Sequence, residues 1–453
     1  MGSGKLENRY ISPKPQIEIG PKFPGNNRYR LLFLNANPYK LGIANLGWQA
    51  IVYYLLSNHS EVSIRVEYVD TISTLHWRNF DLIAISAPFE TIYPNIVRML
   101  YRIGLPLFRQ QRQDPMPLVV AGGILNPFPL RDFIDVFVFG DGRIPLSEII
   151  TLCAEKKRRN ILETLSSSQY RNMGIFVSEF HQPGEKIFAM PELPLNEHPI
   201  HTVWSSTENP YGFNADYLSI MVALGCHRKC AFCVVSHCQG LQEKREDKHL
   251  KVEKILEILE WRRKFSKVSK VKLFFASSLE TEELKEILQE LIKEKVEVFV
   301  GSLNCLQIDE ELLQLIKEAG PNRVIIAPET NEEQRWKVNK NYITDERIFD
   351  IVRLCNKHSL HLTLYLMYGL PGEEEKDVKK VNELLRRVRK LLDKSLRIEV
   401  HAIPLFCKPH TPFQFAPQIL PKESKQRFLL IRSELSDLEI KTENPDLMLL
   451  QAL

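Results

Sequence analysis

Short apolar runs alternate with longer amphipathic segments along most of the chain. The run at 30–35 (Arg-Leu-Leu-Phe-Leu-Asn) is apolar over its middle positions, which is typical of a parallel strand buried on both faces. Strands that alternate with helices indicate a doubly wound, Rossmann-like α/β domain, which we expect to occupy residues 30–150. Its further strands are expected at 62–68, 81–86, 117–121 and 136–139, and its helices at 45–57 and 94–103.

The same alternation resumes at residue 217. Six strand–helix units without a closing seventh and eighth predict an open, partial (β/α)6 barrel over residues 216–405. Functional groups of such a barrel are expected at the carboxyl ends of the strands. The strands are expected at 217–222, 270–275, 296–301, 322–327, 361–366 and 397–404, and the helices between them at 252–265, 282–294, 310–319, 345–358 and 373–392.

Three segments remain outside these two domains. Residues 1–29 are predicted to form an N-terminal arm, and residues 151–215 a linker with a hairpin that turns at Pro183-Gly184. Residues 406–453 are predicted to form a C-terminal extension with a charged helix at 421–438.

Composition adds a few limits. With 453 residues, 44% hydrophobic and 26% charged, the chain has the profile of a globular protein with two or three domains. No apolar run is long enough for a transmembrane helix, and the N-terminus lacks the apolar segment of a signal peptide. Together with eight cysteines in no disulfide-like pattern, this favours a cytoplasmic protein. Lysine- and glutamate-rich helices hint at a thermophile.

A cysteine-rich stretch, 224–233 (Leu-Gly-Cys-His-Arg-Lys-Cys-Ala-Phe-Cys), follows the first expected strand of the barrel. Cys226, Cys230 and Cys233 have the spacing C-x3-C-x2-C, and about 0.003 chance matches are expected for this composition. Three such thiols can each bind one iron of a four-iron cluster and leave the fourth iron open. Cys238 is an alternative fourth ligand. Zinc is an alternative metal, although zinc loops more often carry a second cysteine or histidine pair.

Polar residues also follow the other strands of this domain, where packing alone explains them poorly. The alternative for each single residue is a solvated loop position. These strand ends are Ala276-Ser277-Ser278, Ser302-Leu303-Asn304, Pro328-Glu329-Thr330, the stretch from Met367 to Glu373, and Ile403-Pro404-Leu405.

The cysteine stretch resembles, in its G-C-x-R-x-C-x-F-C form, the cluster-binding loop of the radical S-adenosylmethionine (SAM) superfamily. Ala327-Pro328-Glu329-Thr330 followed by Asn339-Lys340, and the run 408–414 (Lys-Pro-His-Thr-Pro-Phe-Gln), resemble motifs of its cobalamin-binding members. The resemblance covers roughly residues 30–150 and 216–417.

This resemblance implies a [4Fe–4S] cluster on Cys226, Cys230 and Cys233, whose open iron chelates SAM. Reductive cleavage then gives methionine and a 5′-deoxyadenosyl radical. Glu329 is expected at the amino group or ribose of SAM, and Arg335 at its carboxylate. The superfamily's usual Gly-Gly-Glu contact to the amino group is replaced by serines here. The implied SAM contacts are Phe232, Ser277, Ser278, Ser302, Asn304, Glu329, Arg335 and Ile403.

The first domain resembles the cobalamin-binding domain that is fused to many radical SAM proteins. Such domains often carry D-x-H-x-x-G after the first strand, and the matching residues here are Asn37, Tyr39 and Gly42. A phenol with an unperturbed pKa near 10 is a poor cobalt ligand, so Tyr39 is expected to sit against the lower face of the corrin. The alternative is that the glycines serve only as turns. The implied contacts are Asn35, Asn37, Tyr39, Leu41, Gly42, Ser86, Pro88, Glu90, Gly122, Gly123, Asn126, Gly140, Asp141 and Gly142.

The implied activity is methylation of an unactivated carbon through methylcobalamin. The alternatives are a cobalamin-assisted rearrangement or carbon–carbon bond formation, a radical SAM enzyme with an empty first domain, and a non-enzymatic cobalamin or Fe–S sensor. Expected partners are a small-molecule, lipid or peptide substrate and an electron donor such as flavodoxin or ferredoxin, but not nucleic acid. Only Cys153 precedes Cys226, which argues against the methylthio-transferring relatives with their three N-terminal cysteines. Cys407 is either a substrate-side thiol or a buried structural one.

Overall fold

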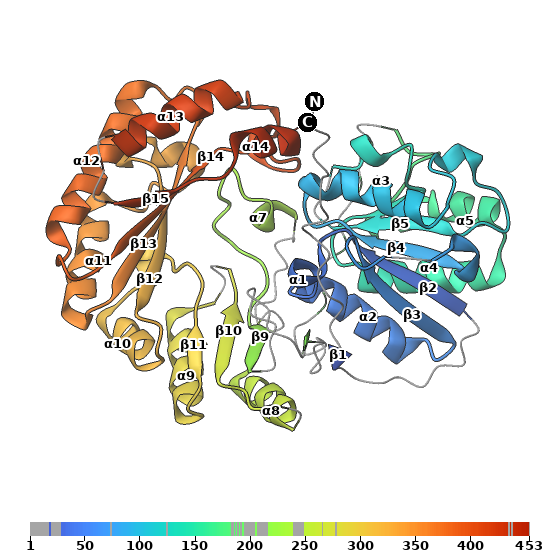
Figure 1. Ribbon diagram of the computed structural model, residues 1–453, viewed down its shortest axis with the longest axis horizontal. Coiled ribbons are helices and arrows are strands. Elements are labelled where there is room, and N and C mark those ends of the chain that lie inside the picture. Colours follow the sequence, from blue (N-terminus) through green and yellow to red (C-terminus); the bar gives the residue numbers. More distant parts are fainter. Residues whose placement is uncertain are drawn as a thin grey trace, which may run out of the picture. The chain divides into compact units, whose positions relative to one another are not determined.

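The computed structural model divides the chain into two compact units (Figure 1). The first comprises Met1–Leu193 and Glu197–Ala215, and the second Pro194–Asn196 and Asp216–Leu453. The predicted hairpin turn at 183–184 lies outside the described residues. The structure describes residues 18–19, 29–72, 75–123, 126–182, 185, 187, 190, 193, 204–205, 216–238, 249–264, 266–276, 279–433, 435 and 438–452.

A six-stranded sheet forms the centre of the first unit. Its strands are β2 (Tyr29–Asn35), β3 (Val62–Tyr68), β4 (Leu82–Ser86), β5 (Leu118–Gly122), β6 (Val136–Val138) and β7 (Ile175–Val177). Their order is β3-β2-β4-β5-β6-β7, and all neighbours are parallel except β6 and β7. The winding reverses between β2 and β4, and ligands of such sheets bind at the carboxyl ends beside this switch point.

Helices cover both faces of this sheet (Figure 1). They are α1 (Tyr39–Gly42), α2 (Leu46–Asn58), α3 (Tyr93–Arg102), α4 (Arg143–Glu155), α5 (Arg158–Leu165) and α6 (Ser168–Arg171). A short antiparallel pair, β1 (Glu18–Ile19) with β8 (Trp204–Ser205), lies apart from the sheet in the hydrogen-bonding pattern.

The continuous apolar run of β2 serves two separate cores. Successive side chains of a strand point to opposite faces. Leu31 and Phe33 accordingly join the cluster under α2 and α4, whereas Leu32 and Leu34 join the cluster under α3. The doubly wound prediction is therefore confirmed.

The boundary expected at residue 150 is wrong. Helix α4 runs through this position, and β7 extends the sheet beyond it by pairing Phe137 with Phe176. The Ile-Phe-Val stretch of β7 is buried because it covers the edge of β6. The first unit thus takes in much of the segment that was expected to be a linker.

The second unit is built on seven parallel strands. They are β9 (Tyr217–Met221), β10 (Lys270–Phe274), β11 (Glu297–Phe299), β12 (Arg323–Glu329), β13 (His361–Tyr368), β14 (Ile398–Pro404) and β15 (Glu439–Lys441). They pair in the orders β11-β10-β9 and β12-β13-β14-β15, and a parallel bridge from Leu303 to Ile326 connects the two groups. The partial barrel is confirmed, with β15 as an addition from the C-terminal extension.

Helices lie on the outer side of this arc of strands (Figure 1). They are α8 (Val252–Arg263), α9 (Thr281–Lys293), α10 (Glu310–Glu318), α11 (Asp345–His358), α12 (Glu375–Leu391) and α13 (Pro421–Ser433). The short helix α7 (Val235–Cys238) lies on the inner side of the arc, and α14 (Pro445–Ala452) follows β15 (Figure 1). Buried and half-buried residues alternate along β14, as expected for a strand with helices on one face only. Across the described ranges, no helix has the length and apolar composition needed to cross a bilayer.

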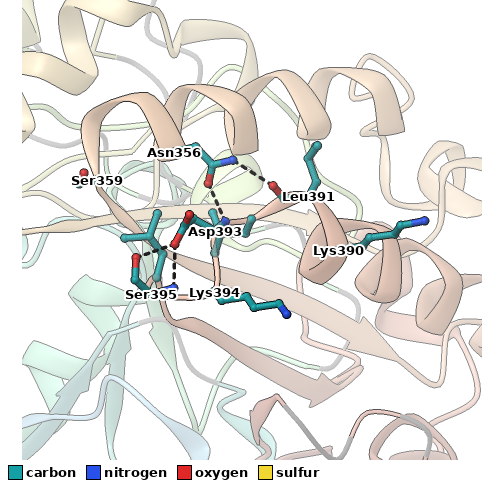
Figure 2. A pocket seen from close by; sticks show the side chains of 9 residues that line it. Asn356, Ser359, Lys390, Leu391, Asp393, Lys394 and Ser395 are labelled. Carbon is teal, nitrogen blue, oxygen red and sulfur yellow. Dashed lines mark hydrogen bonds between the residues drawn. The ribbon is translucent and has the colours of Figure 1, made fainter.

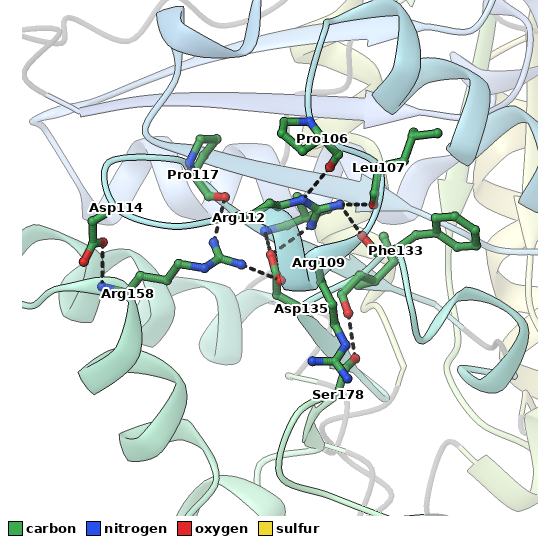
Figure 3. A network of polar contacts seen from close by, with 12 residues as sticks. Pro106, Leu107, Arg109, Arg112, Asp114, Pro117, Phe133, Asp135, Arg158 and Ser178 are labelled. Carbon is green, nitrogen blue, oxygen red and sulfur yellow. Dashed lines mark hydrogen bonds and ion pairs between the residues drawn. The ribbon is translucent and has the colours of Figure 1, made fainter.

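A buried network of charged side chains connects segments near the amino ends of β5 and β6 in the first unit (Figure 3). Asp135 accepts from Arg112 (3.1 Å) and Arg158 (2.5 Å), and the three side chains are at most 8% exposed. Its carboxylate also accepts from the Val119 backbone N–H at 2.8 Å. One carboxylate therefore joins α5 to the starts of β5 and β6.

Replacing Asp135 with Ala is expected to destabilise the first unit by about 3–5 kcal/mol, because it leaves two buried guanidinium groups without their carboxylate. Urea unfolding of the full chain measures the effect. The matched control is Glu163→Ala, which removes the exposed partner of Arg159 on α5. It should cost less than about 0.5 kcal/mol. Equal effects of the two variants would contradict the assignment.

Candidate functional site

The cysteine loop (residues 224–233) leaves the carboxyl end of β9. Gly225 turns the chain with φ +73°, and Lys229 adopts φ +51° between the first two cysteines. The Cys230 thiol is buried, while Cys226 and Cys233 are partly exposed. The three thiols therefore lie on one short, sharply turned segment at the edge where the barrel is expected to carry its function.

Two other segments hold the backbone of this loop. Asn339 Nδ2 donates to the carbonyl oxygens of Arg228 (2.9 Å) and Lys229 (3.1 Å), and the Ala231 N–H donates to Val338 O (3.3 Å). From α7, His237 Nε2 donates to Cys230 O at 3.1 Å. The loop is thus supported from both sides by side-chain and backbone groups.

The electrostatics around Cys230 are dominated by burial. Burial raises the pKa of the Cys230 thiol to about 11, and the charges of Cys226 and Cys233 act in the same direction. The Lys340 ammonium opposes this rise. A bound cation would invert the balance, because a coordinating thiol is deprotonated outright.

The thiols are near enough to influence one another but do not converge on a point. Within the ranges that the structure describes, no three His, Cys, Asp or Glu side chains are close enough to hold a single metal ion. A structural zinc ion needs four converging ligands, whereas in an iron–sulfur cluster each thiolate binds a different iron atom.

Glu329 ends β12 in a left-handed conformation, with φ +67°. Its carboxylate is buried and pairs with Lys340 Nζ at 2.5 Å, and the same ammonium donates to Ala327 O at 2.8 Å. Burial alone would lower the pKa of Lys340, but the charges of Glu329 and Cys230 outweigh burial and raise it. The ammonium group expected beside Glu329 is present, but it belongs to the chain itself.

Arg335 was expected at the carboxylate of SAM, but its guanidinium has partners within the chain. Its side chain is fully buried, and its guanidinium donates to Thr330 O (3.1 Å), Ile343 O (2.8 Å) and Asp345 Oδ1 (2.7 Å). A guanidinium that closes its own loop in this way is not presented to the carboxylate of a ligand. The expected pairing of Arg335 with the SAM carboxylate therefore stays a prediction, and in this structure the guanidinium already has three partners within the chain.

Asn304 retains a donor that suits a ligand. Its Oδ1 accepts from the Leu306 N–H at 3.1 Å, while its buried Nδ2 has no hydrogen-bond partner among the described residues. A buried polar atom without a partner is costly and calls for an explanation, such as a missing ligand. Ser302 is exposed on the same connection, and Ser277 and Ser278 lie outside the described residues.

Apolar residues line the adjoining part of the edge. Phe232 packs against a buried cluster that contains Val338, Leu370, Leu405 and Cys407. Cys407 is 8% exposed, and burial raises the pKa of its thiol. Of the two interpretations of Cys407, the buried structural thiol agrees with its position. The half-buried Ile403 is paired with Met367 across β13 and β14.

The carboxyl edge of the first unit has a floor of small residues with apolar neighbours. Leu41, Phe89 and Phe128 are 41%, 49% and 46% exposed, and they follow β2, β4 and β5 respectively. Small side chains at such an edge leave the backbone open to a flat ligand. The half-exposed residues among the predicted contacts are Ser86, Pro88, Gly122, Gly123, Asn126, Gly140 and Gly142.

Six predicted cobalamin contacts are buried, and several of them hydrogen-bond within the first unit. Asn35 donates to Gly42 O at 3.2 Å, and Asn37 donates to Asn35 Oδ1 at 3.1 Å. Burial opposes ionisation of Asp141, but hydrogen bonds from Arg143 outweigh it and lower its pKa. The buried six are Asn35, Asn37, Tyr39, Gly42, Glu90 and Asp141.

Tyr39 is one of these buried residues. Its side chain is only 3% exposed, and its ring packs edge-on against Tyr68 with 5.0 Å between centroids. A Cβ on Gly42 would lie 2.6 Å from the same Tyr68 ring. The residue in the place of the family's histidine thus belongs to the core, and Gly42 is required by packing.

Three contributions were missed by the sequence reasoning. Asn339 and Lys340 were noted as a motif without a role, and their functions depend on contacts with distant segments. Phe89 lies between two predicted contacts and was not predicted itself, although it is 49% exposed in the connection directly after β4. An exposed aromatic residue directly after a buried strand was the available signal.

A pocket of about 440 Å³ lies at the opposite end of the barrel (Figure 2). Its polar atoms satisfy one another, since Asn356 Oδ1 accepts from the Asp393 N–H (2.8 Å) and Asp393 Oδ1 accepts from Ser395. The turn before β14 is thereby closed on itself. The pocket has no connection with the predicted site residues.

Comparison with protein families agrees with this geometry. Residues 56–177 match the family described as radical SAM proteins, N-terminal, and residues 220–385 match the radical SAM superfamily. Most of the second unit is therefore similar to the radical SAM superfamily, and the cysteine loop lies within the matched stretch. An uncharacterized protein of Methanocaldococcus jannaschii is 23% identical over 421 residues, which cover 92% of this chain and 86% of that protein.

Two solved structures share the fold of both units. The radical SAM methyltransferase TsrM from Kitasatospora setae, solved with cobalamin and a [4Fe-4S] cluster, matches with a TM-score of 0.59 at 17% identity, over 85% of this chain and 76% of that chain. The cobalamin-dependent SAM radical enzyme OxsB matches with a TM-score of 0.54 at 15% identity, over 90% of this chain and 56% of that chain. At these identities the likeness concerns the fold.

Glu373 lies in the connection after β13 and gives the site a pH dependence. Its carboxylate accepts from the Gly369 N–H at 2.7 Å. Burial raises the pKa of Glu373 to about 7, partly offset by this hydrogen bond and by Arg427. The folded chain holds this proton more tightly than the unfolded chain. The contribution of Glu373 to the unfolding free energy is therefore fully present below about pH 4.5 and is lost as the pH rises through 7.

Replacing Glu373 with Gln is expected to raise the melting temperature at pH 8, because the amide keeps an acceptor and buries no charge. The gain in unfolding free energy should be at most about 3 kcal/mol and should vanish near pH 4.5. Thermal unfolding at both pH values measures it. Glu383→Gln on the exposed face of α12 is the control. A gain that is the same at both pH values would contradict the buried-carboxyl explanation.

Proposed function

We propose that the chain is a cobalamin-dependent radical SAM enzyme that methylates an unactivated carbon of its substrate. The observation that carries this is the set of three thiols on one supported loop, Cys226, Cys230 and Cys233, inside the stretch that matches the radical SAM superfamily. The fold shared with TsrM and OxsB supports the cobalamin part of the proposal. When bound, the cofactors supply reductive cleavage of SAM to a 5′-deoxyadenosyl radical and a methyl group carried by cobalamin.

The chain's own residues bind, orient and shield. The three thiolates would hold the cluster, and the open donor of Asn304 would orient a ribose hydroxyl or carboxylate oxygen of SAM. Phe232 and the buried apolar cluster beside it exclude water from that side. Exclusion of water protects a reactive radical and strengthens the polar contacts that remain.

In the first unit, we assign the corrin to the floor of small residues at the carboxyl edge. Gly122 and Gly123 let a flat ring approach the backbone, and Gly123 has no room for a Cβ because Ala87 O would lie 2.4 Å away. Leu41 and Phe89 present apolar surface beside this floor. In this proposal the buried Tyr39 does not bind the metal of the corrin.

The substrate is a small molecule, lipid or peptide in this proposal, and the reductant is a flavodoxin- or ferredoxin-like donor in the cytoplasm. Iron and cobalt content test the cofactors, and product analysis distinguishes methyl transfer from other cobalamin-assisted radical reactions.

Single replacements of Cys226, Cys230 or Cys233 with Ala are expected to abolish cluster assembly, because each thiolate binds a different iron. After anaerobic reconstitution, the unmodified chain should hold about four irons. The variants should lose the cluster spectrum, and 5′-deoxyadenosine formation from SAM under dithionite should fall to background. Cys355→Ala, at a buried thiol of α11, is the matched control and should retain both. One zinc and no iron in the unmodified chain would refute the proposal.

The second test concerns the lower face of the corrin. Cobinamide lacks the nucleotide base of cobalamin, so any nitrogen ligand to its cobalt must come from the protein or the medium. The Co(II) form bound to the chain is expected to show no nitrogen splitting in its electron paramagnetic resonance spectrum, and Tyr39→Phe should leave the spectrum unchanged. A change on that replacement would show that Tyr39 reaches the metal. Four irons without bound corrinoid would refute the cobalamin part alone.

A further inference from the structure

The cysteine loop contains one residue in an unfavourable backbone conformation. Lys229 lies between Cys226 and Cys230 and has φ +51°, in the left-handed region that residues with a Cβ rarely adopt. Such a conformation persists only where the surroundings hold it. Among the described residues, the side chain of Lys229 forms no ion pair that would explain this conformation, and the observed restraint acts on the backbone.

The restraint is supplied from a segment more than a hundred residues away. Asn339 Nδ2 donates to two successive carbonyl oxygens, Arg228 O at 2.9 Å and Lys229 O at 3.1 Å. These carbonyls lie before and after the Cα of Lys229. Two successive carbonyls can face one amide group only when the chain turns sharply between them. The contacts of Asn339 and the left-handed Lys229 are therefore parts of one arrangement.

Asn339 is itself anchored on both sides. It has φ +58°, a conformation that Asn tolerates better than most residues. The preceding Val338 accepts from the Ala231 N–H, and the following Lys340 pairs with the buried Glu329 of β12. The amide is thus held by β12, which does not belong to the loop that it contacts.

We infer that Asn339 is a positioning residue for the cysteine loop: its side-chain amide fixes the Arg228–Lys229 turn, and thereby presets the separation of Cys226 from Cys230 before a cluster binds. This inference rests on the proposed function, since it assumes that the loop binds a cluster. Preorganisation of the ligands stabilises the bound state, because less conformational entropy is lost on binding.

The test compares iron retention in three variants of the full chain. Asn339→Gly removes both donors and keeps a residue suited to φ +58°. Loss of iron from the reconstituted protein to bathophenanthroline disulfonate is expected to be roughly tenfold faster, as for the loss of two hydrogen bonds. Lys229→Gly relieves the left-handed conformation, so the double variant Asn339→Gly, Lys229→Gly should recover most of the retention. The electron paramagnetic resonance spectrum of the reduced cluster with SAM should change in the single variant and return in the double variant.

Ser359→Gly is the matched control for the relief at Lys229. Ser359 also has a positive φ (+53°), but it lies at the end of α11, away from the loop. Combined with Asn339→Gly, it is expected to raise the melting temperature without restoring iron retention. Recovery by Ser359→Gly would mean that Asn339 acts only through general stability.

Two results separate this inference from the proposed function. If the unmodified chain assembles no four-iron cluster, both are wrong. If it does, but Asn339→Gly loses iron at the rate of the unmodified chain, or Lys229→Gly fails to rescue it, only the role of Asn339 is wrong.

Discussion

A buried charge requires a partner, and this requirement organises the carboxyl edge of the barrel. The Lys340 ammonium is buried and is bound by Glu329 Oε1 (2.5 Å) and Ala327 O (2.8 Å), both of which belong to the end of β12. The segment that contains Lys340 must therefore lie against that strand. Its neighbours Val338 and Asn339 are then in place to hold the cysteine loop.

The carboxyl edges of the two units treat polar groups differently. In the first unit, the polar residues at the strand ends bind one another, as Asp141 binds Arg143, and what remains accessible is small or apolar. In the second unit, a donor on Asn304 remains without a partner in the described residues, and the three thiols follow another strand of the same barrel. A large, flat ligand suits the first surface, whereas a polar ligand and a metal cluster suit the second.

Much of the fold follows from local pattern. The strand at Val62–Tyr68 and the helix at Asp345–His358 have the bounds that their apolar periodicity predicts. Strand β15 escaped because its three residues, Glu439-Ile440-Lys441, contain a single apolar side chain. Its place beside β14 depends on pairing with a strand already formed, which no short window of sequence reveals. The boundary expected at residue 150 failed for the same reason, since β7 extends the first unit by pairing with β6.

The same distinction between local sequence pattern and long-range contacts applies to the candidate site. The spacing of the three cysteines is local, so the sequence alone is sufficient to propose them as ligands. Whether a polar side chain remains available to a ligand depends on its partners in the fold, which the sequence does not reveal for Arg335 and Tyr39. The guanidinium of Arg335 donates hydrogen bonds to carbonyls of its own loop, and the ring of Tyr39 packs against the ring of Tyr68. Polar residues near a strand end therefore indicate where a site lies, but burial and pairing decide which of them can take part in it.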